Sequence, residues 1–67
     1  MLTLRADLPT PLVVQIVDGL RGLIAAHVLK PGSKLPSIRA FAAAHGVSVF
    51  TVVEAYDRLV AQGWLVS

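Results

Sequence analysis

The sequence of 67 residues predicts a mainly α fold of three helices, followed by the beginning of a short, truncated β-hairpin. Two observations indicate this fold. Apolar residues recur at the spacing of amphipathic helices in three separate stretches. Prolines and glycines separate these stretches at positions where helices begin and end. A chain this short forms one small domain at most.

The first helix follows an irregular N-terminal arm of residues 1–10, because Pro9 and Pro11 disfavour helix before them. Thr10 is the expected N-cap, with Pro11 at the first helical position, where its missing N–H costs nothing. We expect the helix to end near residues 27–29. Its apolar side consists of Val13, Ile16, Val17, Leu20, Leu23, Ile24 and Val28.

The second helix follows the turn "KPGSK", whose Pro-Gly pair is typical turn chemistry. Pro36 keeps the residue before it out of helical conformation. Ser37 is the expected N-cap of a helix over residues 38–44. Gly46 stands where a left-handed residue would end that helix.

The third helix is expected to begin after Ser48, its N-cap, and to run to about residue 62, where Gly63 ends it. The closing "WLVS" is typical of the beginning of a strand. A single terminal strand is not stable without a partner. We therefore expect a hairpin that is completed beyond Ser67, in a longer protein of which this chain is a piece.

Composition excludes several classes of function. The chain has no Cys, which excludes disulfides and thiolate metal sites. Its two histidines, His27 and His45, lie far apart and predict helix-end roles rather than a metal site. The sequence shows no Gly-rich phosphate loop and no nucleophile matched to a histidine, so it does not predict an enzyme.

The charge pattern indicates neither a membrane protein nor, by itself, a nucleic-acid-binding one. The longest charge-free run, residues 40–53, is too short to span a bilayer, and the N-terminus lacks the apolar region of a signal peptide. The net charge of +2 is compatible with nucleic acid without predicting it. Apolar residues make up 55% of the chain, which indicates that some surface is covered by another domain or a second copy.

A short helix, a tight turn with glycine and a longer helix form the helix-turn-helix pattern. In this arrangement the longer helix, about residues 48–62, enters the major groove of DNA, and the shorter one lies across the backbone. The expected core of the pair, packed on the first helix, consists of Leu35, Phe41, Ala42, Val47, Val52 and Leu59, with Ala55 allowing close approach.

The stretch "LKPGSKLPSIRAFAAAHGVSVFTVVEAYDRLVAQGWL" resembles the winged helix-turn-helix head of the GntR family of bacterial repressors. The matching features are PG, LPS with an arginine two residues later, the alanine-rich helix, GVS, TV, AY, RL and GWL. "VVQIVDGLRGLI" matches the family's preceding helix. The resemblance implies that residues 11–67 form a winged helix-turn-helix DNA-binding domain with a truncated wing.

The segment "TVVEAYDRLVAQGWL" is most similar to the MocR subfamily, in which the DNA-binding head is fused to an aminotransferase-like domain that binds pyridoxal phosphate. The resemblance thus implies a cofactor in a missing C-terminal domain and none in this chain. It also implies a cytoplasmic regulator that binds a double-stranded DNA operator as a homodimer.

The family's DNA-binding positions can be placed on this sequence. Arg39 matches an arginine that meets DNA, and a guanidinium suits bidentate contact to guanine or phosphate. Ser37 matches a residue near a backbone phosphate. Ser48 and Thr51 match the polar start of the recognition helix. Lys34 is close enough in sequence to Ser37 to be a candidate phosphate contact. The plain alternatives are that Arg39 is a solvent-exposed surface arginine and that Ser37 and Ser48 act as helix caps.

The sequence departs from the family pattern at Val49 and Phe50, where an arginine and then a polar residue such as Asn or Thr are more usual. These side chains cannot read hydrogen-bond donors and acceptors, but they can contact a thymine methyl or wedge against a sugar. Helical spacing places Phe50 with Glu54 rather than with Val52, so we expect Phe50 to be exposed.

The alternative function, from another class, is a winged-helix module that binds protein and not DNA. The low charge and the apolar start of the third helix are the features that favour it.

Overall fold

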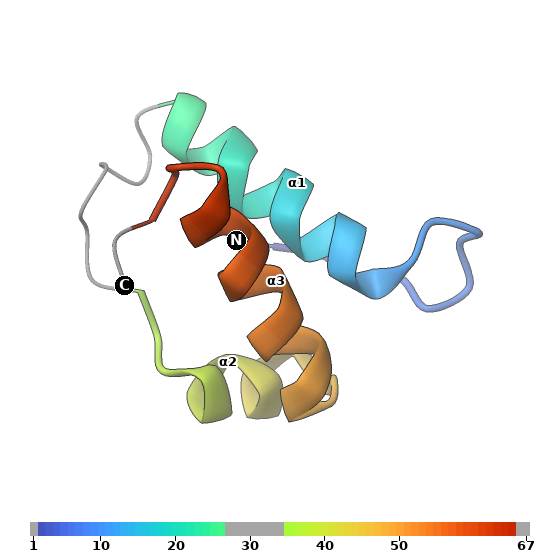
Figure 1. The fold of residues 1–67 in the computed structure, drawn as a ribbon. Coiled ribbons are helices and arrows are strands. Elements are labelled where there is room, and N and C mark those ends of the chain that lie inside the picture. Colours follow the sequence, from blue (N-terminus) through green and yellow to red (C-terminus); the bar gives the residue numbers. More distant parts are fainter. Residues whose placement is uncertain (1, 27–34, 66–67) are drawn as a thin grey trace.

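The computed structural model describes residues 2–26 and 35–65, which contain three helices: α1 (Leu12–Ala25), α2 (Ile38–His45) and α3 (Val49–Ala61). In Figure 1, α3 lies between the other two helices and packs against both. This is the mainly α, helix-turn-helix arrangement that the sequence predicts.

The ends of α2 are set by two local interactions. The Oγ of Ser37, the N-cap, accepts a hydrogen bond from the backbone N–H of Ala40 at 3.1 Å. Gly46 adopts a left-handed conformation with φ of +64°, which a side chain would disfavour, and it ends the helix after His45. Both predictions for this helix are confirmed, with the end one residue later than expected.

The same chemistry begins α3. The Oγ of Ser48 accepts from the N–H of Thr51 at 3.1 Å. Gln62 caps the C-terminal end, and Gly63 follows it with φ of +83°. The turn between α2 and α3 is therefore short, and the first residues of α3 begin directly after it.

The prediction that Thr10 caps α1 is wrong. Pro11 is the N-cap, and its carbonyl accepts from the N–H of Gln15 at 3.1 Å. The fixed φ of proline, here −57°, is compatible with an extended N-cap, so the helix begins one residue later. It ends at Ala25, earlier than the predicted residues 27–29, which lie outside the described residues.

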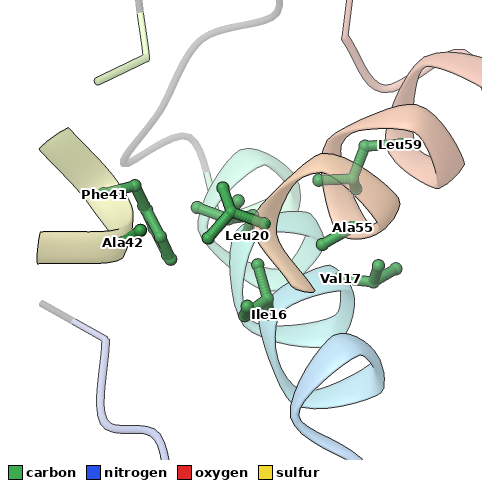
Figure 2. Packing of buried hydrophobic residues seen from close by; sticks show 8 residues of the cluster. Ile16, Val17, Leu20, Phe41, Ala42, Ala55 and Leu59 are labelled. Carbon is green, nitrogen blue, oxygen red and sulfur yellow. The ribbon is translucent and has the colours of Figure 1, made fainter. Parts of the chain in front are cut away.

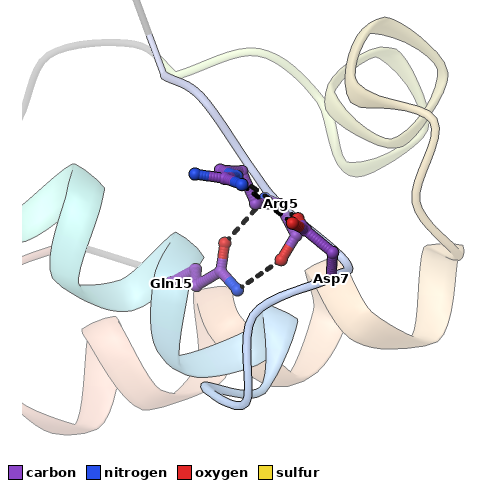
Figure 3. Close-up of polar contacts among 3 residues, drawn as sticks. All are labelled: Arg5, Asp7 and Gln15. Atoms are coloured by element: carbon purple, nitrogen blue, oxygen red, sulfur yellow. Dashed lines mark hydrogen bonds and ion pairs between the residues drawn. The ribbon is translucent and has the colours of Figure 1, made fainter.

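The N-terminal arm is irregular, as predicted, but the side-chain amide of Gln15 holds it against α1 (Figure 3). The Oε1 of Gln15 accepts from the backbone N–H of Arg5 at 2.8 Å, and its Nε2 donates to the carbonyls of Arg5 and Thr10 at 2.9 and 2.8 Å. The guanidinium of Arg5 forms a two-bond ion pair with Asp7. The side-chain amide of Gln15 thus binds the backbone of the arm both at Arg5 and at Thr10.

Packing of Leu2 also holds the arm. Leu2 and Leu4 are partly buried against the core. A Cβ on Gly19 of α1 would overlap the Cδ1 of Leu2. The lack of a side chain at Gly19 therefore makes room for Leu2.

The core combines all three helices. Figure 2 shows Phe41 and Ala42 of α2 on one side of the core, with side chains of α1 and α3 opposite them. Its buried members are Ile16, Val17, Leu20, Phe41, Ala42, Val52, Ala55 and Leu59. Of the six residues predicted to form the core, Phe41, Ala42, Val52 and Leu59 are buried, whereas Leu35 and Val47 are only partly buried against the cluster. Burial of this cluster fixes which faces of α2 and α3 remain outside.

The residues after α3 are not a strand in the described part of the chain. Trp64 and Leu65, where a strand was predicted to begin, form a bend whose N–H groups donate to the carbonyl of Leu59 at 2.9 and 3.4 Å. Both side chains are partly buried against the core. Residues 66–67, the rest of the predicted strand, lie outside the described residues.

Over residues 2–26 and 35–65, no helix has both the length and the apolar character needed to cross a membrane.

Candidate nucleic-acid interface

The candidate interface consists of the beginnings of α2 and α3. Both lie at the same end of the molecule, separated by the length of α2 (Figure 1). Eight residues of helix measure about 12 Å. Ser37 and Arg39 stand at one end of this span, and Ser48 and Thr51 at the other. Lys34, the remaining polar candidate, lies outside the described residues.

Arg39 is the second residue of α2 and its side chain is exposed. None of the ion pairs within residues 2–26 and 35–65 involves it. Those pairs are Arg5–Asp7 at 2.8 Å, Arg21–Asp18 at 3.3 Å and Arg58–Glu54 at 3.3 Å. The acidic residue nearest the start of α3, Glu54, is therefore paired with Arg58 on its own helix. The charge of Arg39 is left without a carboxylate partner in the described part of the chain.

The two hydroxyl groups at the start of α3 bond to each other. The Oγ of Ser48 lies 2.8 Å from the Oγ1 of Thr51 and also accepts from the Thr51 N–H. Ser48 is exposed and Thr51 half-buried. Their first role is to begin the helix, as predicted for Ser48, and their polar atoms already have partners within α3.

Val49 and Phe50 form what we call the apolar leading edge. Phe50 is 87% exposed and Val49 45% exposed. The prediction that Phe50 lies outside the core is confirmed, because Val52 fills the core side of this turn at 0% exposure. The first turn of α3 thus presents two apolar side chains to its surroundings.

Tyr56 ties α3 to the segment that precedes α2. Its hydroxyl donates to the carbonyl of Pro36 at 2.9 Å, across 20 residues of sequence. Its ring meets the ring of Phe41 edge-on at 5.9 Å between centroids. Partial burial raises the pKa of the Tyr56 hydroxyl above its usual value. Because Pro36 directly precedes the N-cap Ser37, this bond fixes where α2 begins.

Sequence reasoning did not find this role of Tyr56. The available signal was its place at the boundary of the apolar face, where a side chain with an apolar ring and a polar tip is suited to bury one end. The partner carbonyl could not be found from the sequence.

His45 occupies the last turn of α2, as predicted. Its Nδ1 lies 3.0 Å from the carbonyl of Phe41, which can only accept, so Nδ1 carries the proton. Its ring stacks on Phe41 with centroids 4.1 Å apart. Phe41 thus contacts two aromatic rings, and His45 has a structural role at the helix end.

The described residues contain no cluster of three or more His, Cys, Asp or Glu side chains that could hold a metal ion. The candidate interface therefore consists of one exposed guanidinium, two helix beginnings and the apolar leading edge.

Comparisons with known proteins fit this geometry. The family model described as "Bacterial regulatory proteins, gntR family" matches residues 12–67. The structure resembles that of YtrA from Sulfolobus acidocaldarius, a GntR-family transcription factor, with a TM-score of 0.94 and 44% sequence identity. That match covers 98% of this chain and 70% of the YtrA chain.

Two curated relatives are regulators. The chain is 42% identical over 57 residues to the HTH-type pyridoxine biosynthesis transcriptional regulator PdxR of Corynebacterium glutamicum, covering 85% of this chain and 13% of that protein. It is 42% identical over 67 residues to the probable rhizopine catabolism regulatory protein MocR of Rhizobium meliloti, covering 100% of this chain and 14% of that protein. The chain thus spans about one seventh of the length of these relatives. The family match over residues 12–67 and the shared three-helix structure show that the chain belongs to the GntR family of bacterial regulatory proteins, as its winged helix-turn-helix DNA-binding domain.

Proposed function

We propose that this chain binds double-stranded operator DNA sequence-specifically, with α3 in the major groove and the beginning of α2 on the DNA backbone. The observation that carries the proposal is the exposed charge of Arg39 at the start of α2, which has no carboxylate partner among residues 2–26 and 35–65. It lies beside a recognition helix whose first two residues, Val49 and Phe50, are also exposed. The boundary we propose for this domain is residues 11–67, with residues 1–10 as an arm.

Each site residue has a proposed role. Arg39 contacts guanine or phosphate through its guanidinium. Ser37 and Ser48 use their Oγ atoms as caps, so their contact to phosphate would run through backbone N–H groups at the helix starts. Thr51 lies beside Ser48 on the same edge, and Lys34 is a further candidate phosphate contact.

The properties of the complete regulator are proposals by family resemblance. We infer a cytoplasmic homodimer, in which two heads bind two half-sites of one operator. The similarity to MocR of Rhizobium meliloti supports the resemblance to the MocR subfamily. From that resemblance we propose an aminotransferase-like domain that binds pyridoxal phosphate elsewhere in the protein. The chain described here is a DNA-binding domain of a regulator and not an enzyme.

The exposure of Phe50 favours a second candidate function, a winged-helix module that binds another protein through the apolar leading edge. A phenyl ring that is 87% exposed suits a protein interface as well as a DNA groove. The two functions differ in their dependence on salt, because phosphate contacts release counterions and apolar protein contacts do not.

The test is fluorescence anisotropy of the chain with labelled DNA duplexes at several salt concentrations. One duplex is recovered from a randomised pool by binding to the chain, and the other has a random sequence. For DNA binding, the logarithm of the affinity falls linearly with the logarithm of the salt concentration. Affinity that does not respond to salt, or no binding to either duplex, would contradict the proposal.

Arg39→Ala sharpens this test. We expect it to weaken binding to the recovered duplex by about 1–3 kcal/mol, the usual value of a bidentate base contact. The matched control is Arg21→Ala, which removes the same charge from the exposed side of α1, outside the helix pair. Equal effects of the two variants would show that only net charge matters and would remove Arg39 from the interface.

A further inference from the structure

The chemistry of the apolar leading edge defines what the first turn of α3 can recognise. The large apolar side chains that are exposed in the described residues are Leu8, Val49, Phe50 and Val60. Two of these four are adjacent in sequence at the beginning of α3. Phe50 is the most exposed of them at 87%. The patch is therefore concentrated where a recognition helix meets base edges.

The polar groups beside this patch already have hydrogen-bond or ion-pair partners within α3. The hydroxyls of Ser48 and Thr51 lie 2.8 Å apart and bond to each other, and Ser48 also caps the helix. Glu54, one turn after Phe50, is paired with Arg58. The first turn of α3 thus offers apolar surface where a donor or acceptor would otherwise discriminate between bases.

Base edges in the major groove carry one apolar group, the C5-methyl of thymine. Cytosine methylated at C5 places a methyl group at the same position on the base, whereas uracil and unmodified cytosine have hydrogen there. An apolar edge gains affinity by removing such a methyl from water, and it gains nothing from the bare base edge.

We propose that Val49 and Phe50 form a methyl-reading edge, which recognises DNA by the C5-methyl groups of thymine and of 5-methylcytosine. The proposal rests on the proposed DNA-binding function and adds the chemical group that is recognised. It predicts that binding depends on cytosine methylation at the contacted positions. Each contacted methyl group increases affinity by about fourfold, the equivalent of burying one methylene-sized group.

The experiment removes single methyl groups from DNA without changing any hydrogen-bonding group. Duplexes recovered from the randomised pool are synthesised again with each thymine replaced in turn by uracil, and with each cytosine replaced by 5-methylcytosine. We expect uracil to weaken binding by about fourfold at one or two positions and to have no effect elsewhere. We expect 5-methylcytosine to strengthen binding where it falls at a contacted position.

The variant Phe50→Ala tests whether the apolar leading edge causes the preference for thymine over uracil. The variant should bind the thymine and uracil duplexes equally while it keeps its salt dependence. Because Phe50 is outside the core, its removal leaves the fold intact, which circular dichroism verifies. The control is Val60→Ala, near the other end of α3 and about 15 Å along the helix, which should keep the preference for thymine.

The possible outcomes separate the two proposals. DNA binding with equal affinity for thymine and uracil at every position overturns the methyl-reading edge and leaves DNA binding intact. Enrichment of no sequence from the pool also overturns it, because a methyl reader must prefer thymine-containing sites. Absence of all DNA binding overturns both. Self-association that Phe50→Ala abolishes, without any dependence on methyl groups, assigns the edge to a second copy of the chain instead.

Discussion

Tyr56→Phe removes a single hydroxyl group and tests how the start of α2 is held in place. The variant keeps the ring that meets Phe41 edge-on at 5.9 Å. It loses the hydrogen bond of 2.9 Å to the carbonyl of Pro36, the residue before the N-cap of α2. Any effect of the variant therefore reports this bond rather than the packing of the ring.

The magnitude follows from the surroundings of the bond. A hydrogen bond between neutral groups contributes about 0.5–1.5 kcal/mol net to stability. Pro36 is exposed and Tyr56 half-buried, so water can replace the hydroxyl at the carbonyl. We therefore expect a loss of about 0.5–1 kcal/mol in the free energy of unfolding, at the lower end of this range. For a domain of this size, that corresponds to a decrease in Tm of about 2–8 °C.

The assay combines thermal unfolding, followed by circular dichroism, with DNA-binding anisotropy. Thr3→Val removes a hydroxyl from an exposed arm residue and serves as the control, with an expected change within about 0.5 kcal/mol. If the bond positions Ser37 and Arg39, Tyr56→Phe should also weaken DNA binding by about two- to fivefold. An unchanged Tm together with unchanged affinity would refute the positioning role.

The pH dependence gives an independent check. Burial raises the pKa of Tyr56, so the folded state favours the neutral phenol more than the unfolded state does. The resulting stabilisation is fully present below the unfolded pKa of about 10 and is lost as pH rises through the folded pKa. Tyr56 is the chain's one tyrosine, so phenolate absorbance follows it alone. The stability advantage of the wild type over Tyr56→Phe should disappear at alkaline pH, and an advantage independent of pH would contradict this account.

Further predictions concern the core, the arm and the leading edge. Leu59→Ala, at a fully buried position, should cost about 2–5 kcal/mol and leave the domain largely unfolded in thermal scans. Gly22→Ala should stabilise α1 by up to about 1 kcal/mol, because nothing lies near the added Cβ. Gly19→Ala should stabilise the protein less, because the added Cβ displaces Leu2. Equal stabilisation by the two variants would show that the docking of Leu2 contributes nothing. Phe50→Asn should change which base is preferred while altering stability by less than about 0.5 kcal/mol, and loss of folding without a change in preference would contradict its exposed position. The isolated chain should bind its preferred duplex weakly, because a single head binds without the effective concentration that a second linked head supplies, and a nanomolar monomeric complex at physiological salt would contradict this.

The sequence determined the features that depend on residues close together in the chain. Ser37 and Ser48 begin α2 and α3, and Gly46 ends α2, because caps act on N–H and carbonyl groups within one helical turn. The exposure of Phe50 followed from helical spacing relative to Val52. The boundaries of α1 were less accurate, since Pro11 rather than Thr10 is the N-cap and the helix ends at Ala25.

The tertiary structure decided which distant groups meet. Tyr56 bonds to Pro36 across 20 residues, and Gln15 holds Arg5 across 10 residues. The spacing of residues in the sequence predicts neither contact, because both contacts depend on where burial of the shared core places the helices and the arm. Hydrophobic burial is non-directional, so a pattern of apolar residues specifies which faces turn inward without specifying which polar atoms are brought together at the edges. Residues close together in the chain therefore decide that α2 and α3 are helices. The contact by which Tyr56 anchors the start of α2 forms only in the folded molecule.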